Sequence, residues 1–165
     1  MRKIFVLVLF AAVFSGFTFA ADGDDFADRF HAGDWALYRV MGLDDFRQHH
    51  SIASIEGEGD AAVVTFAVVN IVKGKKGKPL EFRKTIGELR ASDAETMEKV
   101  VRKEMVKVGG REIEADVVVE TKDGKEVTVY GSDSLPVNGV ILWQEKGAPP
   151  MSELLDFGWA EGVKK

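Results

Sequence analysis

Short connections rich in turn-forming residues punctuate the second half of the chain and restrict how its segments can be joined. The pairs Gly109-Gly110, Asp123-Gly124 and Asn138-Gly139 separate runs in which apolar and polar residues alternate. Such pairs favour tight turns, and a period of two is typical of strands with one buried face. Parallel strands need crossover connections of a dozen or more residues, so strands joined this closely must be antiparallel.

The pattern predicts a mainly β fold with a minor helical part. We expect seven to nine strands with one apolar and one charged face, curled round a core as a curved antiparallel sheet or half-barrel. Strands are expected at 34–41, 47–56, 61–72, 79–86, 102–108, on both sides of the Asp123-Gly124 turn, at 140–144 and in the apolar segment 151–159.

Residues 92–108 carry signals for both helix and strand. Ser92 followed by Glu95 fits a capping box, and the apolar residues that follow fall on one helical stripe. A two-residue loop at 109–110 would instead place Lys107 opposite Glu112 and Val106 opposite Ile113, and such pairs are each worth about 0.2–1 kcal/mol. We therefore expect a short helix near 93–100, followed by a strand.

The next hairpin turns at Asp123-Gly124. A three-residue loop with Gly124 in the left-handed conformation would pair Val119 with Val129. This register would extend the apolar face across three strands.

Residues 1–20 fit a secretory signal peptide. A basic start precedes an uncharged apolar stretch, and Thr18 and Ala20 are small residues at the positions that a signal peptidase reads. The stretch is short for a membrane span, which needs about 20 apolar residues. We therefore expect cleavage near Ala20-Ala21, which leaves residues 21–165 as a single β-rich domain in the periplasm or secreted.

The chain contains no cysteine, which excludes disulfides, thiolate metal sites and an N-terminal lipoprotein anchor from the mature form. Without Arg2 and Lys3, 20 basic residues stand against 27 acidic ones, which gives a formal charge of −7. An acidic domain without a basic, aromatic-rich patch is not expected to bind nucleic acid. We also expect no stable membrane anchor.

The histidines of the chain are His31, His49 and His50. Adjacent residues of a strand point to opposite faces, so His49 and His50 could share a metal ion only across a bulge. Asp44 and Asp45 are near in sequence and could add carboxylate oxygens, which makes His49, His50 and Asp45 the candidate metal ligands. Exposed polar residues beside a loop are the simpler interpretation, so we expect no metal and no cofactor.

No set of residues indicates catalysis. Ser132-Asp133-Ser134 has no nucleophile-elbow motif around it, and serine and aspartate before a proline are ordinary turn formers. The acidic residues of segment 112–120 alternate with apolar ones and fit a solvated strand face. We therefore assign no catalytic residue.

Several motifs resemble a segment of uncharacterised exported bacterial proteins rich in β structure. They are Gly33-Asp34-Trp35 with Tyr38, the hairpin 106–113, the segment 132–136 and the turn 138–140. Those proteins are distantly similar to periplasmic lipoprotein carriers (LolA-like half-barrels). The resemblance covers mainly residues 100–142 and implies a fold and a compartment, without catalytic residues to transfer. Val129-Tyr130-Gly131 stands where such families often have a tryptophan.

We expect an exported, non-catalytic binding or carrier domain whose concave face meets an apolar ligand or an envelope protein. One alternative is an exported hydrolase that uses His49 or His50 with a carboxylate, and another is a structural subunit of an envelope assembly. Residues 21–165 contain six phenylalanines and three tryptophans. These rings suffice for a core of this size and leave few to line a large empty cavity.

Overall fold

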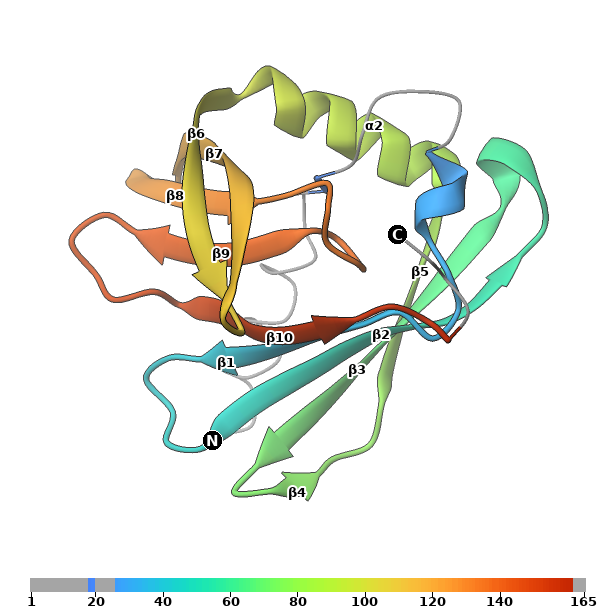
Figure 1. Cartoon of the computed structure of the whole chain (residues 1–165), viewed down its shortest axis with the longest axis horizontal. Helices are drawn as coiled ribbons and strands as arrows, with labels where there is room; N and C mark the ends of the chain where they lie inside the picture. Colours follow the sequence, from blue (N-terminus) through green and yellow to red (C-terminus); the bar gives the residue numbers. More distant parts are fainter. Residues whose placement is uncertain (1–17, 20–25, 162–165) are drawn as a thin grey trace.

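The computed structural model describes residues 18–19 and 26–161, which form a curved, open antiparallel sheet crossed by one α-helix (Figure 1). Its strands are β1 (Trp35–Val40), β2 (Phe46–Glu56), β3 (Val63–Val72), β4 (Lys75–Lys76), β5 (Leu80–Thr85), β6 (Val100–Val108), β7 (Arg111–Lys122), β8 (Lys125–Gly131), β9 (Val140–Glu145) and β10 (Ser152–Gly158). The predicted mainly β fold with a short helix is confirmed.

The strands neighbour one another in the order β4-β3-β2-β1-β10-β9-β8-β7-β6, and β5 also pairs with β3. Within the described residues the sheet has ten strands, one more than the upper end of the predicted range. The extra strand is β4, a two-residue segment inside the basic turn that follows β3. Its partners Ile71 and Val72 lie at the end of β3, where the turn folds back on the strand.

The β6–β7 hairpin has the predicted register. Val106 pairs with Ile113 and Lys107 with Glu112, on either side of the Gly109-Gly110 turn. Figure 1 shows this hairpin crossing β8 and β9, with its tip at β10. There the Arg111 guanidinium lies 4.8 Å from the centre of the Phe157 ring.

The predicted pairing of Val119 with Val129 is wrong by one residue. Asp123 and Gly124 form a two-residue turn, both with positive φ, and Val118 is opposite Val129. Aspartate tolerates the left-handed conformation, so the turn needs no third residue. Because side chains alternate along a strand, Val118 is the residue that joins Val129 on the apolar face.

The helix α2 (Ile86–Glu98) begins earlier than predicted, which corrects the expected position near 93–100. Thr85 closes its first turn with a capping box: the Thr85 backbone N–H donates to Glu88 Oε2 at 2.7 Å, and the Glu88 N–H donates to Thr85 Oγ1 at 3.1 Å. Ser92, the predicted cap, lies within the helix. Both segments fit the capping-box pattern, and the end of β5 at Thr85 selects the first one.

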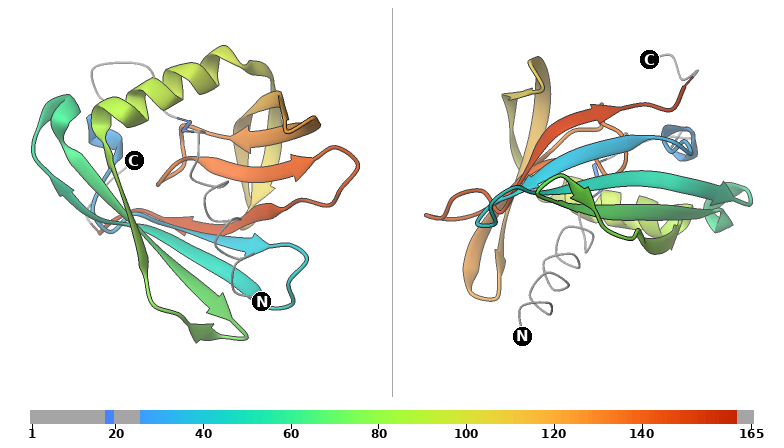
Figure 2. Two further views of the ribbon diagram at one scale, coloured as in Figure 1. Left: turned by 180° about the vertical axis from the view of Figure 1, so that it is seen from behind. Right: turned by 90° about the horizontal axis from the view of Figure 1, so that it is seen from below.

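Most of the space inside the curve of the sheet is filled. The 3-10 helix η1 (Ala27–Arg29), the connection 132–139 and α2 lie between the arms of the sheet (Figure 1, Figure 2). Phe26 and Phe30, which flank η1, pack with tilted rings whose centres are 5.5 Å apart. They join one buried cluster with Leu135 and Val137 of the connection, Ile86 and Leu89 of α2, and core residues of β1, β2 and β3. Among the described residues no helix combines the length and apolar character that a membrane span requires.

Candidate functional site

Phe19 lies buried against β7, β8 and β9, with 1 % of its surface exposed. We call its seat the Phe19 slot, which is formed by buried residues of these three strands. The wall residues are Val118, Val127, Val129 and Val140, with Met97, Val100 and Trp143 packed around them. Phe19 and the four valines form one buried hydrophobic cluster, so the surroundings of the phenyl ring are apolar.

The slot lies on the same face of the sheet as the Tyr38 side chain. Val129 is opposite Trp143, Trp143 is opposite Ser152, and Ser152 is opposite Val40. Residues directly opposite one another in a ladder point to the same face of a sheet. Val40 shares that face with Tyr38 of the main core, so the slot is the β7–β9 end of the concave side.

Gly131 provides the floor of the slot. A Cβ atom added to Gly131 would overlap three atoms of the Phe19 ring. The φ angle of Gly131 lies outside the left-handed region, so its backbone conformation does not require glycine. The absence of a side chain at this position is therefore explained by the space that the ring occupies.

Polar groups at the rim bind the backbone of Phe19. Its N–H donates to the Asn138 carbonyl oxygen at 3.1 Å, and its carbonyl oxygen accepts from Arg29 Nη1 at 3.1 Å. Arg29 Nη2 donates to the Asp133 carbonyl oxygen. Burial lowers the pKa of the Arg29 guanidinium, and the nearby Asp133 and Asp93 carboxylates oppose this effect. The slot thus combines a seat for a ring with one acceptor and one donor for a peptide unit.

The candidate metal ligands do not converge. His49 and His50 lie on opposite faces of β2: the His49 ring stacks on Trp35 at 5.7 Å, and the buried His50 ring packs on Tyr38 at 4.6 Å. Burial, and secondarily His49, lowers the pKa of His50 to about 3. Within the part of the chain that the structure describes, no three His, Asp or Glu side chains form a group able to hold a metal ion.

The other polar residues considered in the sequence serve local structure. His31 lies 3.4 Å from the buried Asp34 carboxylate, which also accepts the His31 backbone N–H. The Ser132 and Ser134 hydroxyls are 2.9 Å apart, and Ser132 Oγ accepts the Ser134 backbone N–H at 3.3 Å. The two serine contacts fix the start of the β8–β9 connection.

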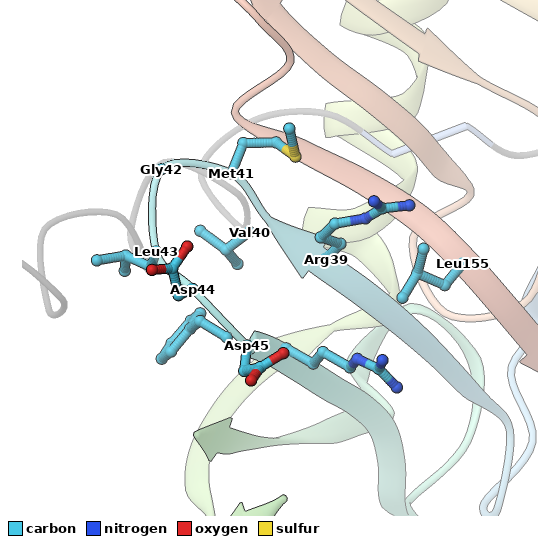
Figure 3. Close-up of a pocket in the computed structure, with 10 residues that line it drawn as sticks. Arg39, Val40, Met41, Gly42, Leu43, Asp44, Asp45 and Leu155 are labelled. Carbon is cyan, nitrogen blue, oxygen red and sulfur yellow. The ribbon is translucent and has the colours of Figure 1, made fainter. Parts of the chain in front are cut away.

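Asp45 lies in the β1–β2 turn, at a surface pocket of about 570 Å³ (Figure 3). Arg39, Asp44, Asp45 and Arg47 line it with exposed charges of both signs. Leu43, on its rim, is 48 % exposed. An open pocket with solvated charges of both signs holds no arrangement that selects a ligand.

Comparison with protein-family models, with curated proteins and with solved structures found no match for this chain. Function therefore has to be inferred from the geometry of the molecule. The sequence prediction did not find the Phe19 slot, because Phe19 belongs to the segment interpreted as a signal peptide. The one local signal was Gly131, a glycine at the end of an apolar strand that is not needed for a turn.

Proposed function

We propose that this chain is exported, loses residues 1–20, and acts in the periplasm or outside the cell as a non-catalytic domain that binds an apolar group in the Phe19 slot. The position of Phe19 supports the proposal, since this residue of the predicted signal peptide is buried against β7–β9. Cleavage after Ala20 would remove the ring and leave its seat in the folded domain.

A vacated seat of this kind favours an apolar ligand because its walls lose their packing partner. Burial of a phenylalanine side chain contributes about 1.5–3 kcal/mol relative to exposure in water. Apolar cavities exclude water and bind small apolar molecules. A ligand that fills the slot would restore the contacts that the valines made with Phe19.

The proposal does not include a large lipid cavity, since η1, α2 and the connection 132–139 occupy most of the concave side. The proposal does include a common architecture with periplasmic lipoprotein carriers. An open curved sheet crossed by α2 supports this part of it. The ligand group that fits is the size of one ring.

The hydrolase alternative has less support from the geometry. His50 is buried, and its lowered pKa of about 3 keeps it neutral at physiological pH. His49 is half-buried and stacked on Trp35. Among residues 18–19 and 26–161, no arrangement of either ring with a carboxylate and a nucleophile supports hydrolysis.

The test has two parts. The full chain is expressed in a Gram-negative host, and the intact mass of the protein recovered from the periplasm identifies its first residue, expected at Ala21. The protein is then titrated with the apolar fluorophore N-phenyl-1-naphthylamine, and we expect saturable fluorescence with one site per chain. Recovery of uncleaved cytoplasmic protein, or the absence of saturable binding, would overturn the proposal.

A matched pair of variants locates the binding. Val129→Ala changes a wall of the slot, whereas Leu43→Ala removes an exposed apolar side chain from the pocket at the β1–β2 turn. We expect the dissociation constant of the fluorophore to change in the first variant and to stay unchanged in the second. The reverse result would place the ligand in the surface pocket.

A further inference from the structure

We infer that the natural ligand of the Phe19 slot is an aromatic side chain carried on an extended peptide segment of a partner protein. This inference rests on the proposed function, because it requires that export removes Phe19 from its seat. It adds the chemical class of the ligand, which is a peptide rather than a lipid or a free hydrocarbon.

The backbone contacts of Phe19 are the first argument. Both polar groups of a single peptide residue are bound: its N–H by the Asn138 carbonyl oxygen and its carbonyl oxygen by Arg29 Nη1, each at 3.1 Å. The hydrocarbon tail of a lipid has no groups that could make these bonds. Extended peptides are recognised in this way elsewhere, with main-chain hydrogen bonds for affinity and a pocket for a side chain for specificity.

Gly131 supplies the second argument. Its backbone conformation is open to any residue, yet a Cβ there would overlap the Phe19 ring. A segment that is removed during export has no need of a permanent seat in the mature domain. The space above Gly131 therefore indicates an aromatic group that enters the slot after Phe19 has left.

Arg29 supplies the third argument. In the full chain its Nη1 donates to Phe19 and its Nη2 to the Asp133 carbonyl oxygen. Loss of Phe19 takes away the acceptor of Nη1, and a partly buried guanidinium donor without an acceptor is costly. Asn138, at the same rim, also has a buried side-chain nitrogen without a hydrogen-bond partner among residues 18–19 and 26–161. Both donors favour a ligand that carries carbonyl oxygens.

The test uses two synthetic peptides against purified protein of residues 21–165. The first has the sequence of residues 15–20, Ser-Gly-Phe-Thr-Phe-Ala, acetylated and amidated at its ends. The second differs by Phe19→Ala and retains Phe17 as an internal control. In isothermal titration calorimetry we expect the first peptide to bind at one site, and the second to bind roughly tenfold or more weakly.

Protein variants then assign the site. Gly131→Ala should weaken binding of the first peptide roughly tenfold or more by filling the seat. Gly77→Ala is the matched control, because its added Cβ would lie 3.4 Å from Asn70 O, which is ordinary contact, and outside the slot. Arg29→Gln should also weaken binding of the first peptide, because Arg29 Nη1 is the donor to the carbonyl oxygen of the seated residue.

The possible results separate the two proposals. Saturable binding of the fluorophore without binding of the first peptide would overturn the peptide ligand and leave the apolar binding domain intact. Equal affinity for the two peptides would do the same. An intact mass that includes Thr18 and Phe19 in the exported protein would overturn both proposals. If Gly131→Ala fails to fold, the comparison of the two peptides on the unaltered protein still decides.

Discussion

The Tyr38 hydroxyl donates to the Val140 carbonyl oxygen at 2.8 Å and so joins β1 to β9 across the concave side of the sheet. Its second contact is Asn138 Oδ1 at 3.3 Å, at the rim of the Phe19 slot. Tyr38 is almost completely buried. The hydroxyl therefore links the main core to the site that we propose for ligand binding.

Tyr38→Phe should destabilise the fold by about 1–3 kcal/mol, because it leaves a buried carbonyl oxygen without its donor. The free energy of unfolding in urea measures the change. The chain has two tyrosines, and Tyr130→Phe is the control. Tyr130 is half-buried, so its variant should lose about 0.5 kcal/mol or less. Equal losses in the two variants would show that the hydrogen bond to Val140 adds nothing measurable to the free energy of unfolding.

The buried His50 makes stability depend on pH. Its pKa of about 3 in the folded state lies below the ordinary value of 6.5, with burial as the main cause. The unfolded chain therefore binds the proton first as pH falls. The contribution of His50 to stability is complete above about pH 6.5 and is lost between there and about pH 3, at up to about 1.4 kcal/mol per pH unit.

Urea unfolding at pH 7, 6, 5 and 4 checks this dependence. His50→Gln should flatten the profile between pH 7 and 5. Carboxylates titrate in both proteins, so the difference in slope isolates His50. Parallel profiles for His50→Gln and the unaltered protein would contradict the prediction.

Thr85→Ala should lower stability by about 1 kcal/mol, because it removes the N-cap of α2. Ser92→Ala is the contrasting change, since Ser92 lies inside the helix and its hydroxyl is buried without a hydrogen-bond partner in the described part of the chain. That variant should be neutral or slightly more stable. The urea midpoints of the two variants distinguish the observed cap from the predicted one.

Gly131→Ala should cost different amounts of stability in two forms of the chain. In a chain that begins at Thr18, the added methyl group displaces the Phe19 ring and costs about 1.5–3 kcal/mol, the value of burying that side chain. In residues 21–165 the ring is absent, and the loss should fall below about 1 kcal/mol. Thermal or urea unfolding of the four proteins measures this difference, and equal losses in both forms would show that Phe19 does not occupy the slot.

Local patterns were sufficient for much of the fold. The register of the β6–β7 hairpin follows from charge and apolar pairs that are close in sequence, such as Lys107 with Glu112. The predictions were wrong where the sequence allowed two local structures. Asp123-Gly124 allows two-residue and three-residue turns, and both Thr85 and Ser92 begin a capping-box pattern.

The Phe19 slot was beyond this kind of reasoning. Phe19 meets its floor at Gly131 and its backbone acceptor at Asn138, residues far along the chain. A prediction from the sequence sets a signal peptide aside before packing is considered. The metal candidates could be judged more closely, because alternation along β2 already placed His49 and His50 on opposite faces.

The presence of Phe19 in the slot also orders events in time. Under the proposed function, a precursor whose own phenylalanine fills the seat cannot accept the same group from another protein before export. Peptide-bond cleavage after Ala20 is then the step that makes the domain competent to bind. The domain would then be unable to bind its ligand where it is synthesised and able to bind it only after export across the membrane.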